Sequence, residues 1–308
     1  MKRKDFILFI TFVFILISCL LVSCGAKKKY TPVSSAVRRN RVDLPLPKPQ
    51  FGATSRPGNG GLNGGAGNDE QSLKQKEIAS IKIPDKVLEI LKTHANKNWN
   101  EDAEGYNLTG ANQLFTRVKY QVGSREKFLY NDETNENRAK ESKAARREFY
   151  LACEYNANFI KAFAGVVNRL VATDELAAKN KKRLEGLLEN VRSYAIDYYN
   201  VYSLLKKKQN KLDVLTLKKL QSLKAEFLKL EKEQQELYDV IQLIINDYNN
   251  DTPINSSEPT HNLKSGDTLP SEIIQYWEED RHYGEFSRKR GVLLDTASVV
   301  RKLLNDIY

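Results

Sequence analysis

Nine residues between Leu220 and Tyr248 follow one another at alternating intervals of three and four, and this run most constrains the fold. They are Leu220, Leu223, Phe227, Leu230, Gln234, Leu237, Ile241, Ile244 and Tyr248, and Gln234 is the single polar member. This spacing places side chains on one face of an α-helix and does not match the two-residue period of a strand. The pattern predicts one amphipathic helix of about 35 residues.

Other stretches of residues 71–308 show the same helical period. We expect a long helix over residues 133–171, an apolar stripe over 184–198, a final helix from 269 to 307, and a short helix interrupted near Pro84. Of the later prolines, those at positions 253 and 259 lie outside the long helices and Pro270 stands at the start of the final one, so none interrupts a helix. Residues 249–268 are polar and predict a surface loop. The fold prediction is an all-α bundle of about five to seven helices, several of them long.

The N-terminus predicts export and a lipid anchor. Three basic residues precede an uncharged stretch of 17 residues from Phe6 to Val22, and Leu21-Val-Ser-Cys24 follows the bacterial lipobox pattern. We predict a signal peptide over residues 1–23 and acylation of Cys24 with palmitate or a similar chain. Cys19 ends a second match, Leu16-Ile-Ser-Cys19, but cleavage there would leave an apolar run at the new N-terminus. An uncleaved membrane anchor is the remaining alternative.

Residues 24–70 predict a disordered tether behind the lipidated cysteine. Four prolines lie between residues 32 and 49, and a glycine-rich run covers residues 58–67. Glycine-rich loops bind phosphate when a Gly-Lys-Ser or Gly-Lys-Thr sequence follows, whereas this run continues into Asn68-Asp-Glu70. The predicted domains are therefore 1–23 signal peptide, 24–70 tether and 71–308 helical bundle.

Charge and residue types argue against several classes of function. The net charge is +10, but eleven basic and four acidic side chains lie in residues 1–70, which leaves the predicted bundle nearly neutral. Nucleic-acid binding is therefore not expected. The three cysteines and three histidines form no metal-ligand motif, so we expect no metal, no cofactor and no catalytic site. Cys153 has aromatic and aliphatic neighbours and predicts a core position rather than a nucleophile.

Aromatic residues near the polar loop are the candidate partner-binding site. The chain departs most from a closed bundle in the loop 249–268 and the segment 277–283, which hold or adjoin Trp277, Tyr283 and Phe286. Aromatic residues dominate the binding energy of protein interfaces. In the alternative interpretation, Trp277 belongs to the core. Glu278 and His282 share a helical face but are too few for a zinc site, and they predict a solvated face with salt bridges.

Three collinear segments carry a resemblance to a known family. They are Tyr120-Gln-Val-Gly123, Phe128-Leu-Tyr-Asn-Asp-Glu133 and Arg147-Glu-Phe-Tyr-Leu-Ala-Cys-Glu-Tyr155. Together with the lipobox and the tether, they resemble the Borrelia paralogous outer-surface lipoprotein family that includes complement regulator-acquiring surface protein 1. The similarity runs from about residue 110 to 250. After residue 250 the chain departs from the founding member.

The resemblance implies a helical, non-enzymatic lipoprotein of the cell outer membrane, anchored in the lipid bilayer and exposed at the surface. It also implies binding of a host serum or vector protein for complement and immune evasion, as a virulence factor. The ligand would be of the factor H type or a terminal complement component, although the departure after residue 250 leaves both factor H binding and dimerisation open. A monomer and a weak homodimer are both compatible with the sequence. The alternatives are an adhesin for vector or extracellular-matrix components and a structural periplasmic lipoprotein.

Overall fold

A computed structural model describes residues 66–123, 126–254, 259–279 and 282–308, which form one compact unit. The α-helices are α2 (Ala66–Ser80), α3 (Asp85–Ala95), α4 (Glu101–Glu104), α5 (Leu114–Arg117), α6 (Glu136–Ala152), α7 (Ala157–Val167), α8 (Asp174–Lys208), α9 (Leu217–Asn249), α10 (Pro270–Glu279) and α11 (His282–Asn305); the strands are β1 (Lys119–Val122) and β2 (Glu126–Leu129); the 3-10 turns are η1 (Asn168–Leu170) and η2 (Gln209–Val214). The predicted all-α class is confirmed. The described residues contain ten α-helices rather than five to seven, in part because α4 and α5 are single turns that leave no periodic signal.

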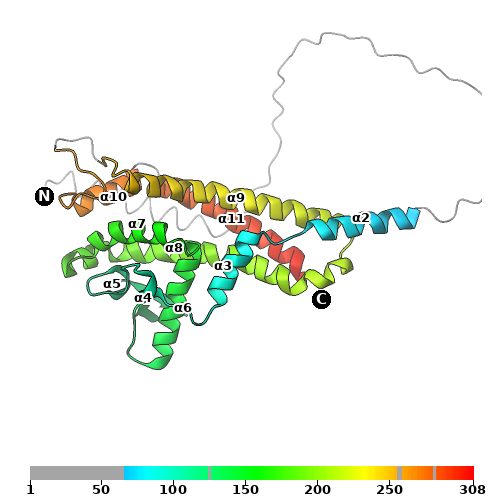
Figure 1. Cartoon of the computed structure of the whole chain (residues 1–308), viewed down its shortest axis with the longest axis horizontal. Coiled ribbons are helices and arrows are strands. Elements are labelled where there is room, and N and C mark those ends of the chain that lie inside the picture. The colour runs from blue at the N-terminus through cyan, green and yellow to red at the C-terminus, as the bar shows by residue number, and fades with distance from the viewer. Residues whose placement is uncertain (1–65, 124–125, 255–258, 280–281) are drawn as a thin grey trace, which may run out of the picture. The chain divides into compact units, whose positions relative to one another are not determined.

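Three long helices, α8, α9 and α11, form the centre of the bundle (Figure 1). α11 packs along both α8 and α9. The predicted stripe of α9 is buried from Leu220 to Ile241, including Gln234, and the Thr216 side chain caps the helix by accepting a hydrogen bond from the Lys219 amide. Lys208 Nζ donates to the Ile307 carbonyl at 2.6 Å, so the end of α8 lies beside the end of α11.

The long helix predicted over residues 133–171 is wrong, because the chain turns at residues 153–156. α6 ends at Ala152 with Cys153 as its C-cap, and both Glu154 and Tyr155 have left-handed backbone conformations, with φ of 54° and 55°. Asn156 then starts α7, since its side chain accepts a hydrogen bond from the Phe159 amide at 3.1 Å. The left-handed pair ends the hydrogen-bond ladder of α6 and sends α7 in a new direction.

A small antiparallel hairpin of β1 and β2 also lies outside the sequence prediction. Tyr120 pairs with Phe128 in its register, and Gly123 has a φ of 57°. Tyr120 is buried, and its ring lies 5.2 Å from that of Tyr130. Four residues per strand are too few for a periodic signal, so packing against α6 and α8 decides this element.

The buried side chains form two clusters. One joins α2 and α3 to α9, α11 and much of α8, and the other surrounds the hairpin, α6, α7 and the start of α8. Cys153 is 2% exposed and lies in the second cluster, which confirms the core prediction for this residue. Burial raises the pKa of its thiol well above the usual value, so the reactive thiolate is disfavoured.

The N-terminal predictions are only partly within the described residues. The predicted signal peptide, Cys19, Cys24 and residues 24–65 of the predicted tether lie outside them. α2 begins at Ala66, so the last five residues assigned to the tether are helical, with Asp69 in the first turn. Pro84 separates α2 from α3, as the sequence predicts. None of the described helices is long and apolar enough to cross a membrane.

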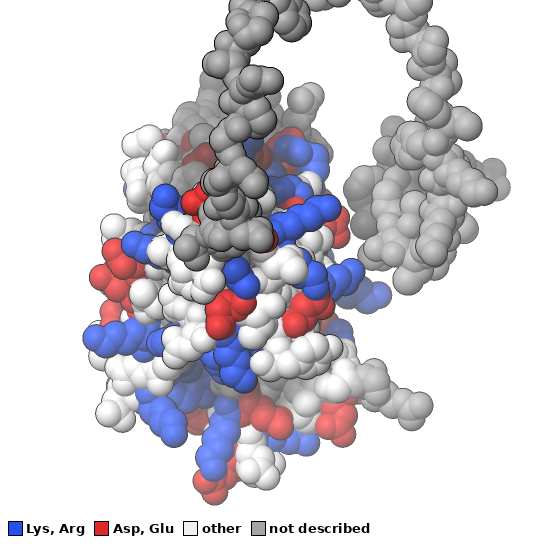
Figure 2. All heavy atoms as spheres, turned by 90° about the vertical axis from the view of Figure 1, so that its right-hand side faces the viewer, with Lys and Arg blue, Asp and Glu red and all other residues white. Residues whose placement is uncertain are grey.

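Charged side chains of both signs are interspersed on the face that Figure 2 shows. Several of them pair between helices: Lys219 Nζ lies 2.8 Å from Asp306, and Lys224 Nζ lies 3.1 Å from Glu77. Such exposed pairs each contribute little to stability.

Candidate functional site

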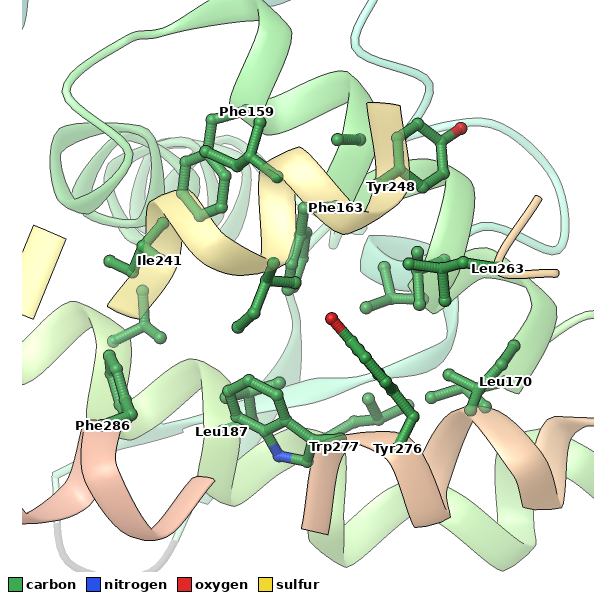
Figure 3. Close-up of a pocket in the computed structure, with 18 of the residues that line it drawn as sticks. Phe159, Phe163, Leu170, Leu187, Ile241, Tyr248, Leu263, Tyr276, Trp277 and Phe286 are labelled. Carbon is green, nitrogen blue, oxygen red and sulfur yellow. The ribbon is translucent and has the colours of Figure 1, made fainter. Parts of the chain in front are cut away.

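An apolar cavity of about 110 Å³ lies where α7, α8, α9 and α10 meet (Figure 3). Its wall includes Phe159 and Phe163 of α7, Leu170 of η1, Leu187 of α8, Ile241 and Tyr248 of α9, Leu263 of the loop, Tyr276 and Trp277 of α10, and Phe286 of α11. This lining favours a hydrocarbon or aromatic group over a charged one.

α10 covers this cavity with one apolar face. Ile273 and Tyr276, three residues apart, are buried. Trp277, four residues after Ile273, lies on the same face and is partly buried. The helix begins after Leu269, whose backbone amide donates to the Glu272 carboxylate at 2.7 Å. The Glu272 carboxylate thus accepts a hydrogen bond from a backbone amide at the start of α10, which stabilises this end of the helix in water. α10 can therefore lie at the surface while its apolar face packs on the cavity.

Polar contacts hold α10 and the loop before it. The Tyr276 hydroxyl donates to the Asp247 carboxylate at 2.7 Å, and Arg183 pairs with Glu278 at 2.5 Å. Arg169 donates to the Leu263 carbonyl at 2.9 Å and to the Thr268 carbonyl. Arg169 of η1 therefore holds the second half of the predicted loop, from the buried Leu263 to Thr268, and α8 and α9 hold α10.

The three predicted anchor residues differ in exposure. The Tyr283 side chain is 38% exposed, and its ring lies 5.9 Å from that of Trp277. Trp277 is partly buried in the cavity wall, so it is both a core residue and a rim residue. Phe286 is only 3% exposed and its ring lies 6.4 Å from that of Tyr194 on α8, so the expectation that it is uncovered was wrong.

The family model described as "Borrelia Bbcrasp-1 domain containing protein" matches residues 109–305, well over half of the chain. The chain belongs to the Borrelia Bbcrasp-1 domain family. This confirms the resemblance found in the sequence. The match continues through α10 and α11, so the segment after residue 250 that departs from the founding member is still part of the family domain.

Several solved structures of Borrelia surface proteins share the fold. The Borrelia burgdorferi outer surface lipoprotein BBA64 is 15% identical with a TM-score of 0.51, over 78% of this chain and 100% of that one. The orthologous Borrelia spielmanii protein BSA64 is 17% identical with a TM-score of 0.51, over 78% and 99%. The Lyme disease associated outer surface protein BBA65 of Borrelia burgdorferi is 16% identical with a TM-score of 0.50, over 76% and 99%. No curated protein matches the chain.

Within this Bbcrasp-1 domain, Tyr276 is the site residue that sequence reasoning missed. It lies three residues after Ile273, and this spacing is the signal that could have identified the buried face of α10. Trp277 then lies at the edge of that face, between core and solvent. Glu278 and His282 were predicted as solvated surface. Glu278 forms an ion pair with Arg183 in which both side chains are partly exposed, as that prediction expects, and the His282 ring lies 4.8 Å from the Tyr276 ring. The described residues contain no group of three side chains arranged to hold a metal ion.

Proposed function

We propose that the protein is a lipid-anchored lipoprotein of the Borrelia outer membrane that is exposed at the cell surface and binds a host serum protein for immune evasion. Acylated Cys24 is its membrane anchor, residues 24–65 are the tether, and the helical unit carries the binding face. Membership of the Bbcrasp-1 domain family and the fold shared with Borrelia outer surface proteins support this proposal. Binding, rather than catalysis, is its activity.

The observation that carries the proposal is the pair of aromatic rings at the edge of the apolar cavity. Trp277 and Tyr283, which we call the aromatic rim, lie on consecutive helices, and Tyr283 is open to solvent. Trp and Tyr are the residue types that most often dominate protein interfaces. The partner is a serum protein that places an apolar side chain against the aromatic rim, because the adjoining cavity wall offers no charged partner except the paired Arg183.

Capture of serum proteins by intact cells that display the full chain tests this site. Tyr283→Ala should weaken capture by about thirtyfold, which corresponds to about 2 kcal/mol for one interface anchor. Its melting temperature should stay close to that of the wild type, since the removed ring is exposed. Tyr308→Ala is the matched control, because Tyr308 is 96% exposed at the opposite end of α11 and should not change capture.

Two results would contradict the assignment. Undiminished capture by Tyr283→Ala excludes the aromatic rim, and resistance of the protein to protease added to intact cells places it in the periplasm as a structural lipoprotein. Capture of a matrix or vector component in place of a serum protein would identify an adhesin. Phe286→Ala is not a useful probe of binding, because removal of a buried ring costs about 3–5 kcal/mol of stability.

A further inference from the structure

A second pocket lies on another part of the bundle, between α3, the turn after α6, α8 and α9. It has a volume of about 160 Å³, and its wall includes Lys86, Glu154, Tyr198, Tyr199, Glu231, Gln234 and Tyr238. We call it the tyrosine–glutamate pocket. Unlike the apolar cavity, it combines aromatic rings with carboxylates.

The charges on the wall of the tyrosine–glutamate pocket do not balance. Glu154 and Glu231 supply two carboxylates, and among the described residues of the wall Lys86 alone is basic. The Glu154 side chain is 10% exposed, and the left-handed backbone at this residue directs it away from the course of α6. Of the wall residues that the structure describes, none is a cationic partner of Glu231. Its Oε1 accepts a hydrogen bond from the Tyr202 hydroxyl at 3.4 Å, and burial raises the pKa of its carboxyl group, so a cation bound beside it would stabilise the ionised form.

Lys86 already shows how this pocket holds an ammonium group. Its Nζ lies 2.6 Å from the Glu154 carboxylate and 4.9 Å from the centre of the Tyr238 ring. An ammonium ion between a carboxylate and the face of an aromatic ring has the geometry in which proteins bind organic cations. The Lys86 side chain is 64% exposed, so it reaches the pocket from the solvent side and can leave it.

Two buried polar atoms in the wall have no hydrogen-bond partner among the described residues. They are the Tyr199 hydroxyl and Gln234 Oε1, and the two residues are 2% and 7% exposed. A buried polar atom without a partner costs about 1–3 kcal/mol, so the wall of this pocket is polar beneath its tyrosine rings. Gln234 is also the single polar residue in the apolar stripe of α9, and it lies in the wall of this pocket.

We propose that the tyrosine–glutamate pocket binds a small organic ammonium ion, primary or methylated, which displaces the ammonium group of Lys86. Glu154 and Glu231 provide the charge, and the tyrosine rings contact the methyl or methylene groups. A cavity of about 150 Å³ holds a molecule of the size of benzene, so a trimethylammonium group fits. This proposal does not depend on the aromatic rim or on the host partner.

Calorimetric titration of the full-length chain, purified in a non-ionic detergent, tests the proposal with two matched probes. Choline carries the charge, and 3,3-dimethyl-1-butanol is its uncharged isostere. We expect saturable binding of choline, and binding of the isostere that is weaker by at least about tenfold, a difference of about 1.4 kcal/mol. Equal binding of the two compounds, or no saturable binding of choline to either the wild type or Lys86→Met, would overturn it.

Variants then assign the binding to this pocket. Lys86→Met removes the competing ammonium and should tighten choline binding, whereas Glu154→Gln should weaken it by about tenfold or more. Tyr238→Phe keeps the ring and should retain binding, and Tyr238→Leu should weaken it.

Glu136→Gln is the control, because Glu136 forms an ion pair with Lys140 at 2.7 Å on the exposed surface. Melting temperatures close to that of the wild type show that each variant is folded. Choline binding that is the same in Lys86→Met, Glu154→Gln and the wild type would exclude the tyrosine–glutamate pocket.

Discussion

At the scale of single residues, His94 links stability to pH. Its Nδ1 lies 2.8 Å from the Tyr155 hydroxyl, and its pKa is lowered, first by burial and then by the nearby charge of Arg147. The unfolded chain therefore binds a proton at a higher pH than the folded protein does. Stability contributed by neutral His94 is complete above the unfolded pKa of about 6.5 and is lost as the pH falls below it.

We predict that His94→Gln flattens the dependence of stability on pH between pH 7.5 and 5.5. The free energy of unfolding of the wild type should fall more steeply over this interval than that of the variant. The difference stays well below the limit of about 1.4 kcal/mol per pH unit for one proton, because water screens a partly exposed imidazole. Urea denaturation at several pH values measures it, and parallel profiles would show that His94 does not titrate in this range.

At the scale of elements, the α6–α7 corner decides the path of the chain. Two left-handed residues, Glu154 and Tyr155, precede the cap at Asn156, and this turn directs Glu154 into the tyrosine–glutamate pocket and Tyr155 toward His94. Cys153, just before the turn, is buried among the aromatic side chains of the second cluster. The same short turn therefore places Cys153 in the second core cluster and Glu154 in the tyrosine–glutamate pocket.

Asn156→Ala should destabilise the protein by about 1 kcal/mol, because the Phe159 amide loses its hydrogen-bond acceptor at the start of α7. Thermal or urea denaturation measures this loss. Asn158→Ala is the matched control, since Asn158 is exposed within the first turn of the same helix and does not cap it. Alanine favours the helix interior, so the control should be neutral or slightly stabilising. Equal destabilisation by the two variants would argue against the cap.

At the scale of the whole molecule, the proposed anchor and the helical unit are separate parts of one chain. Both core clusters consist of residues within the described part of the chain, which begins at Ala66, whereas the predicted anchor at Cys24 lies outside it. Attachment through acyl chains on one cysteine leaves such a unit in the aqueous phase, since each buried CH₂ contributes about 0.8 kcal/mol to membrane binding.

We predict that Cys24→Ala abolishes incorporation of radioactive palmitate and leaves an uncleaved precursor. Cys19→Ala should be labelled and processed like the wild type, because Leu21-Val-Ser precedes Cys24. Metabolic labelling in the native host, followed by gel electrophoresis, distinguishes the two. Label that persists in Cys24→Ala would move the anchor to Cys19.

Local patterns in the sequence predicted the elements whose signal lies within a few turns of chain. The three-and-four spacing from Leu220 to Ile241 identified the buried face of α9, and Pro84 identified the break between α2 and α3. The helical class, the polar loop and the core position of Cys153 follow from the same kind of local evidence. Burial of a periodic stripe depends mainly on the side chains of that stripe, which is why sequence alone sufficed.

Contacts between distant segments decided the rest. Phe286 is covered because Tyr194 of α8 packs against it. The residues near Phe286 in the sequence do not predict this contact. The hairpin is held by α6 and α8, and its four-residue strands carry no periodic signal of their own. The tyrosine–glutamate pocket joins Lys86 of α3 and Glu231 of α9 with Glu154 of the turn between α6 and α7. Electrostatic and aromatic contacts act over a few ångströms in space, so only the packing of these helices brings the three charges together.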